Sequence, residues 1–169
     1  MSDESESGRL WAPWRIDYIL GPKAKDCPFC KGWDAGPGVE YLVLTKQRHS
    51  MVIMNRYPYT GGHLMVVPQE HVHSITDLSE DAYIELMLLL RESTARLVHA
   101  LGCHGVNTGI NQGEAAGAGI ESHMHIHLVP RWRGDTNFMP VTASVRVVSQ
   151  GLDHAYGLLR PHFEDLDAG

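Results

Sequence analysis

The segment His123-Met-His-Ile-His-Leu-Val-Pro130 places three histidines at alternating positions. Successive side chains of a β-strand point to opposite faces, so His123, His125 and His127 share one face of a strand over residues 123–129. The apolar residues between them then pack into a core on the other face. Such a row of imidazoles predicts a catalytic centre or a metal trio, or only the polar face of a strand half exposed to water.

The chain before this strand favours chemistry on an anion. Residues 112–122 include Gly113, Gly117 and Gly119, and backbone N–H groups approach an anion closely where no Cβ intervenes. Asn111 and Gln112 add uncharged hydrogen-bond donors. A neutral imidazole is a competent nucleophile toward phosphorus. The sequence contains no serine-centred elbow or phosphate-binding P-loop that would compete for this role.

The remaining pattern predicts an α+β fold with an antiparallel sheet, one long central helix and a short C-terminal helix. Strands are expected over residues 39–45, 51–55, 64–67, 106–111 and 123–129, and the short helix over 151–159. Asp77 or Ser79 can cap a helix of about 20 residues that ends at Gly102. Its apolar residues recur at helical spacing and predict a buried stripe: Tyr83, Leu86, Met87, Leu90, Leu97 and Val98. Strands and helices do not alternate, which excludes a doubly wound fold.

Length and charge predict one domain between two acidic tails. The chain has 169 residues and a net charge of −6, and acids without bases gather at both ends. We therefore expect a disordered, solvated tail over residues 1–9, a single domain over 10–160 and an acidic C-terminal tail over 161–169. The charge of the rest is balanced, so the basic stripe that duplex nucleic acid requires is missing. The chain also has no apolar run of membrane-spanning length and no signal peptide, so the expected location is the cytoplasm.

Cys27-Pro-Phe-Cys30 is a second, separate signal. Three cysteines are too few for a disulfide scaffold. The pair is compatible with zinc binding, with redox chemistry, or with two small packed side chains.

Several of these segments together resemble one family. His123-Met-His-Ile-His-Leu-Val resembles the His-φ-His-φ-His-φ-φ motif of the histidine triad (HIT) family of nucleotidyl hydrolases and transferases, where φ is an apolar residue. Asn55-Arg-Tyr-Pro-Tyr-Thr-Gly-Gly-His63-Leu-Met-Val-Val-Pro resembles the strand–turn–strand before that family's central helix. Trp11-Ala-Pro-Trp-Arg, Cys27-Pro-Phe-Cys30 and Arg131-Trp-Arg-Gly-Asp-Thr-Asn-Phe-Met-Pro140 resemble its diadenosine tetraphosphate phosphorylase-like branch.

The resemblance implies a HIT-like fold, a homodimer and a role for each histidine of the triad. His125 is the expected nucleophile, which takes a nucleotidyl group from an α-phosphate. His127 contacts that phosphate, and His123 orients the strand. The implied and expected nucleotide-binding residues are Asn55 for the ribose, Gln112 for the phosphate, and Asn111, Gly117, Gly119 and His127. A structural role at the start of a strand is the interpretation for His63.

Relatives in the family also imply a structural zinc ion that takes no part in the chemistry. Its expected ligands are Cys27, Cys30, His71 and His123, which would pin the N-terminal part of the chain to the catalytic strand. His73 is the alternative to His71, since sequence does not distinguish them.

The favoured function is phosphorolysis or hydrolysis of a dinucleoside polyphosphate, most of all diadenosine tetraphosphate, through a nucleotidyl-histidine intermediate. The alternatives are a purine nucleoside phosphoramidase and a nucleotide-binding HIT protein with negligible turnover. Ile120 stands where better-known HIT hydrolases often carry Ser or Thr, which hydrogen-bonds the leaving group. A polyphosphate leaving group needs little protonation, so Ile120 favours a dinucleoside polyphosphate over a phosphoramidate. Whether phosphate or water is the acceptor stays open.

Overall fold

The computed structural model describes residues 26–135 and 151–167. The predicted N-terminal tail, the Trp11–Arg15 segment and residues 136–140 of the Arg131–Pro140 segment lie outside these ranges. None of the helices in the described ranges combines the length and the apolar composition needed to cross a bilayer.

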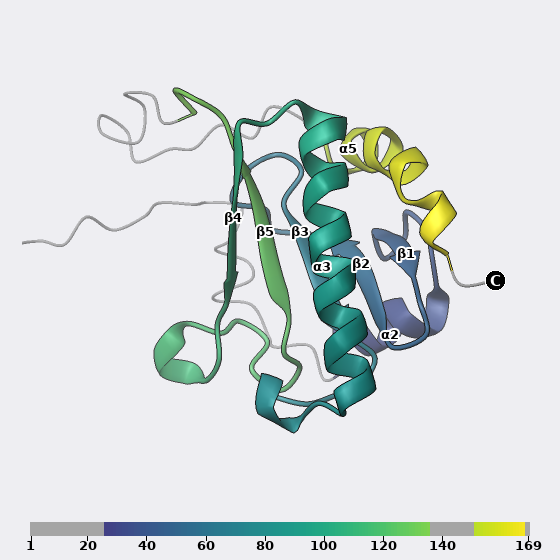
Figure 1. Cartoon of the computed structure of the whole chain (residues 1–169), viewed down its shortest axis with the longest axis vertical. Helices are drawn as coiled ribbons and strands as arrows, with labels where there is room; N and C mark the ends of the chain where they lie inside the picture. Colours follow the sequence, from purple (N-terminus) through teal and green to yellow (C-terminus); the bar gives the residue numbers. More distant parts are fainter. Residues whose placement is uncertain (1–25, 136–150, 168–169) are drawn as a thin grey trace, which may run out of the picture.

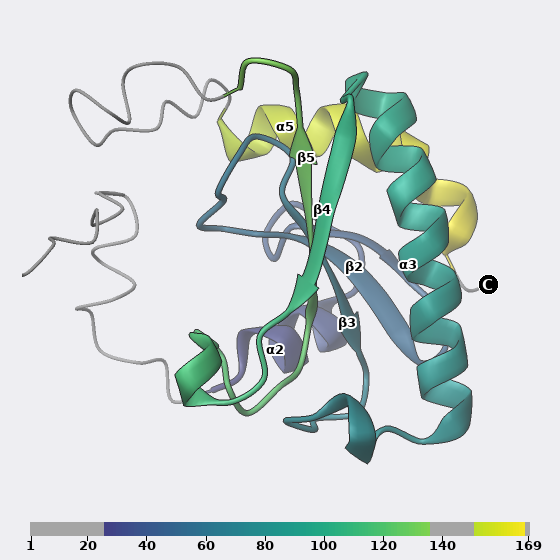
Figure 2. The same ribbon diagram turned by 60° about the vertical axis from the view of Figure 1, so that its left-hand side comes forward.

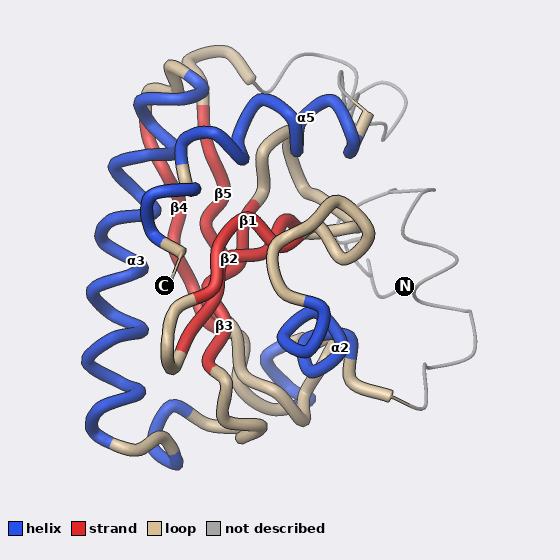
Figure 3. Tube along the Cα trace, turned by 90° about the vertical axis from the view of Figure 1, so that its right-hand side faces the viewer, coloured by secondary structure: helices blue, strands red, loops and turns tan. Residues whose placement is uncertain are grey.

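Five antiparallel strands form a single sheet in the described chain (Figure 1). Their order across the sheet begins with β1 (Val43–Lys46), β2 (Ser50–Met54) and β3 (Leu64–Pro68). It continues with β5 (Ile126–Arg131) and ends at the edge with β4 (Gly105–Ile110). Helix α3 (Glu80–Leu101) crosses one face and α2 (Pro28–Ala35) lies on the other, as Figures 2 and 3 show from two sides. The expected α+β fold with a long central helix and a short C-terminal helix, α5 (Leu152–Leu159), is confirmed.

Helix α3 begins and ends where local chemistry predicts, but it buries a different stripe. The Ser79 side chain accepts a hydrogen bond from the Ala82 amide, and Gly102 ends the helix at φ 57°. The buried positions are Ala82, Leu86, Leu89, Ser93 and Leu97. The stripe predicted from sequence was thus wrong at Tyr83, Met87 and Val98, which are 37–43% exposed. The helix is apolar on more than one face, and the face with the small residues Ala82 and Ser93 lies against the sheet.

Strand β5 begins at Ile126, three residues later than the triad alternation predicts. Its pairing with β3 starts at Val66↔Ile126, and Pro68 ends β3 two residues further along. The Met124 amide instead donates to the carbonyl of Val72, at 2.7 Å. His123 and His125 therefore lie in the segment that leads into β5, and His127 lies on the strand itself.

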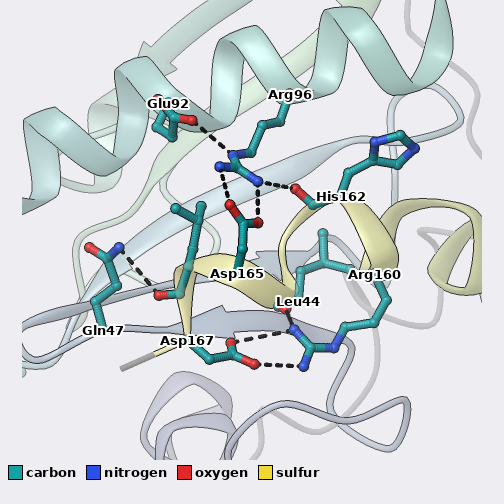
Figure 4. Close-up of polar contacts among 9 residues, drawn as sticks. Leu44, Gln47, Glu92, Arg96, Arg160, His162, Asp165 and Asp167 are labelled. Carbon is teal, nitrogen blue, oxygen red and sulfur yellow. Dashed lines mark hydrogen bonds and ion pairs between the residues drawn. The ribbon is translucent and has the colours of Figure 1, made fainter. Parts of the chain in front are cut away.

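The described part of the expected C-terminal tail, residues 161–167, packs on the domain rather than extending from it. Phe163 is fully buried. Asp165 forms a bidentate ion pair with Arg96 of α3, and Asp167 accepts from Arg160 at 2.6 Å (Figure 4). The prediction of a solvated tail was wrong for these residues. Asp165 pairs with Arg96, which is distant in sequence, and the burial of Phe163 holds the segment against the domain.

Candidate functional site

A cavity of about 160 Å³ lies beside the triad. His125 and His127 form part of its wall. The rest of the wall is mostly apolar and includes Phe29, Leu42, Ile53 and Met65. This combination of an apolar body and a few convergent polar groups is typical of a small-molecule site. The predicted nucleotide-binding residues that line it are Asn55, Asn111, Gly117, Gly119 and His127, and Ile120 lies among them.

The hydrogen bonds of His125 determine which of its ring nitrogens is reactive. Nδ1 lies 3.0 Å from the carbonyl oxygen of His123, which can only accept, so Nδ1 carries the proton. Nε2 is then the nitrogen with a lone pair, on a ring that lines the cavity. The side chain is buried, and this burial lowers the pKa of His125, which favours the neutral imidazole. A neutral imidazole with an unprotonated nitrogen at a cavity is equipped for nucleophilic attack.

His63 sets the proton position of His127. The amide of Tyr59 donates to Nδ1 of His63 at 3.1 Å, so that nitrogen is an acceptor and the ring proton is on Nε2. Nε2 lies 3.0 Å from Nδ1 of His127 and donates to it. The proton of neutral His127 is therefore on its own Nε2, as a hydrogen-bond donor on a ring that lines the cavity. The interpretation of His63 as a mainly structural residue missed this link, which depends on the pairing of β3, immediately after His63, with β5.

Two predicted amide residues have different surroundings. Asn55 lines the cavity, and its side chain lies 3.3 Å from Nδ1 of His63 while its oxygen accepts from the Tyr57 amide. The side-chain oxygen of Gln112 accepts instead from the Ser74 hydroxyl and the Ile75 amide, and Gln112 is not part of the cavity wall. The roles of both residues in nucleotide binding stay predictions.

The structure brings together the four predicted metal ligands. One ligand atom from each of Cys27, Cys30, His71 and His123 lies within 4.8 Å of every other. Nδ1 of His123 is 3.3 Å from Sγ of Cys27, and Nδ1 of His71 is 3.2 Å from Sγ of Cys30. His73 lies outside the group, and its Nδ1 pairs instead with Asp77 at 3.2 Å.

The protonation of the cluster suits a cation. Nε2 of His123 lies 2.9 Å from the carbonyl of Pro68 and carries the proton, so Nδ1 faces the thiols with its lone pair. Burial lowers the pKa of His123 to about 4, which keeps the ring neutral. Burial and the neighbouring Cys27 raise the pKa of the Cys30 thiol to about 11. A bound cation reverses that last effect, because it stabilises the thiolate.

Phe29 is a site residue that sequence reasoning missed. Its ring is 2% exposed, lines the cavity and lies 4.9 Å from the ring of His125. Its position in the sequence could have indicated this role. Phe29 lies between Cys27 and Cys30, so it must lie close to His123 if both cysteines do.

Comparison with known proteins gives a consistent result. The HIT domain family model matches residues 39–134. AP-4-A phosphorylase of Mycobacterium tuberculosis is 34% identical over 159 residues, which cover 89% of this chain and 82% of that protein. A hypothetical histidine triad nucleotide-binding protein of Sulfolobus tokodaii superposes with a TM-score of 0.66 at 23% identity, covering 83% of this chain and 93% of its own. A Zn-bound histidine triad family protein of Mycobacterium smegmatis superposes with a TM-score of 0.65 at 23% identity, covering 83% and 95%.

Proposed function

The chain belongs to the HIT domain family, and on that premise we propose that it cleaves dinucleoside polyphosphates, with diadenosine tetraphosphate as the favoured substrate. The observation that carries the proposal is the tautomer of His125, whose Nδ1 is bonded to the His123 carbonyl and whose Nε2 is left as a nucleophile at the cavity. The similarity to an AP-4-A phosphorylase over most of both chains supports this choice of substrate.

In this reaction Nε2 of His125 attacks the α-phosphorus. A bond forms between nitrogen and phosphorus, the bridging P–O bond breaks, and ATP leaves. Nε2–H of His127 donates to a phosphate oxygen, and the backbone of residues 113–119 stabilises the charge on the five-coordinate phosphorus. An oxygen of inorganic phosphate or of water then displaces His125, which releases ADP or AMP and restores the imidazole.

Product analysis tests this proposal. The protein is incubated with diadenosine tetraphosphate, with and without inorganic phosphate, and the nucleotides are separated. ADP plus ATP that appear only with phosphate identify a phosphorylase, and AMP plus ATP without phosphate identify an asymmetric hydrolase. If neither pair appears and AMP is released from an adenosine phosphoramidate, the enzyme is the phosphoramidase alternative. Nucleotide binding without turnover of either substrate identifies a binding protein.

We also propose that the Cys27, Cys30, His71 and His123 cluster holds a structural zinc ion. Ligand atoms around tetrahedral zinc with sulfur and nitrogen donors lie roughly 3.3–3.8 Å apart. The contacts within the cluster, at 3.2, 3.3 and 3.7 Å, lie at or within 0.1 Å of that range. The Zn-bound relative from Mycobacterium smegmatis supports the identity of the metal. Elemental analysis of protein purified without chelator is expected to give one zinc per chain, and a protein without zinc would contradict the proposal.

We further propose that the protein acts as a homodimer. Strand β4 lies at the edge of the described sheet, and the neighbouring helix α3 exposes an apolar face. Pairing of β4 with a second β4 about a twofold axis would continue the sheet and cover that face. The exposed apolar residues of α3 on that face are Tyr83, Ile84, Met87, Leu88 and Val98. Sedimentation analysis is expected to give a dimer for the native protein and a monomer for Leu88→Glu.

A further inference from the structure

His123 connects the proposed metal cluster to the proposed nucleophile, His125. Nδ1 of His123 faces Cys27 and Cys30, while the carbonyl oxygen of the same residue accepts the hydrogen bond from Nδ1 of His125. We infer that a metal ion in the cluster holds His125 in its reactive position, acting through His123 and Phe29, so that metal loading controls nucleotide binding and catalysis. The inference rests on the metal and nucleophile roles proposed above and adds the coupling between them.

His123 forms the first connection. Its ring is tied on one side to the Pro68 carbonyl and on the other to the thiols, and it packs edge-on against His71 at 4.8 Å. A bond from Nδ1 of His123 to a metal ion would restrict the ring more than its hydrogen bond to sulfur does. Because the carbonyl of the same residue sets the tautomer of His125, this restriction reaches the nucleophile across a single residue.

Phe29 forms the second connection. It lies between the two cysteines and touches both histidines, with ring centroids 5.4 Å from His123 and 4.9 Å from His125. Fixing the sulfur atoms on either side of Phe29 also fixes its ring. That ring is part of the cavity wall, so the same constraint acts on the surface that would receive a nucleoside.

Helix α2 is otherwise held at the opposite end. Its C-terminal half is anchored to β1 by Lys46, whose ammonium donates to the Trp33 carbonyl at 2.8 Å and lies over the Trp33 ring. Cys27, the residue immediately before the helix, makes no side-chain capping hydrogen bond. Lys31 pairs locally with Asp26 at this end, so the polar side-chain contacts that join it to the rest of the described domain are the thiol–imidazole contacts of the cluster. Loss of the metal is expected to loosen that end first, while α3 and the sheet core on the other face stay intact.

The matched variants His71→Ala and His73→Ala test the coupling. Both side chains are exposed, neither lines the cavity, and only His71 belongs to the cluster. Three quantities are measured on each variant and on the native protein: metal content, AMP affinity by calorimetry, and the His125 tautomer from ¹⁵N NMR of the ring, assigned with His125→Asn. For His71→Ala we expect loss of the metal, AMP binding weakened about tenfold or more, and signals from both tautomers of His125. His73→Ala is expected to match the native protein in all three.

The coupling is contradicted if metal-free His71→Ala binds AMP with native affinity and keeps its proton on Nδ1 of His125. It is contradicted equally if the native protein holds no metal in the cluster. Should His71→Ala fail to fold, the same measurements on native protein before and after chelation and reloading decide the question. Phe29→Leu in metal-loaded protein adds an independent arm, and unchanged AMP affinity there would exclude Phe29 as a connection. None of the three measured quantities depends on cleavage of diadenosine tetraphosphate, so the coupling and the proposed reaction can be confirmed or contradicted separately.

Discussion

Replacement of His63 by asparagine tests the hydrogen-bond chain that sets the proton on His127. The asparagine oxygen is placed to accept from the Tyr59 amide as Nδ1 of His63 does, but the side chain is too short to reach Nδ1 of His127. The lost contact is a 3.0 Å hydrogen bond from a side chain that is 1% exposed. Such a bond is worth about 1–1.5 kcal/mol net, and 1.4 kcal/mol is roughly a tenfold change in rate. In the proposed reaction His127 donates to a phosphate whose charge grows in the transition state, so we expect kcat to fall about tenfold with little change in KM.

Steady-state kinetics with diadenosine tetraphosphate, and circular dichroism to check folding, measure this effect. The control is His63→Gln, whose longer amide places an N–H donor near the position of Nε2 and is expected to restore much of kcat. A native kcat for His63→Asn would show that the hydrogen bond from His63 to His127 does not contribute to catalysis. A lower kcat for the glutamine variant than for the asparagine variant would lead to the same conclusion, since the donor to His127 would then be irrelevant.

Three further predictions concern the leaving group and the C-terminal segment. Ile120→Ser restores a hydroxyl at the cavity wall and is expected to raise kcat/KM for adenosine phosphoramidates, so an unchanged value removes the argument drawn from Ile120. Phe163→Ala empties a fully buried site and is expected to lower the unfolding free energy by about 3–5 kcal/mol, measured by urea denaturation. The hydrogen bond from Arg96 holds the pKa of Asp165 below its usual range, so its contribution to stability is present at neutral pH and lost as the pH falls below about 4. Asp165→Asn is expected to weaken that acid dependence, and an identical pH profile for the variant would show that the ion pair contributes nothing.

The features that sequence predicted well are those governed by local rules. Ser79 and Gly102 cap α3 through bonds to residues a few positions away. The alternation of the triad predicted one shared face, but only His125 and His127 line the cavity, whereas His123 precedes β5 and faces the cysteines. The grouping of Cys27, Cys30, His71 and His123 was also predicted, with His73 as the alternative to His71, because family resemblance supplied the histidines where the spacing of the cysteines alone left three interpretations.

The features that sequence missed depend on contacts between distant residues. His63 and His127 are 64 residues apart, and their hydrogen bond follows only from the pairing of β3 with β5. Arg96 and Asp165 are 69 residues apart, so a local run of acids looked like a solvated tail. The buried face of α3 was ambiguous for a similar reason, since apolar side chains on several faces left the choice to the shape of the sheet.

Covalent catalysis through His125 is tested most directly by locating the nucleotidyl group on the protein. Protein turning over diadenosine tetraphosphate without added phosphate is quenched in alkaline denaturant, where a phosphoramidate bond survives, and its peptides are mapped by mass spectrometry. We expect an adenylyl group on His125, at least one ATP released for each adenylyl group, and no such group on the His125→Ala variant. An adenylyl group on His127 or another residue, or ATP release from the His125→Ala variant at the native rate, would contradict this mechanism.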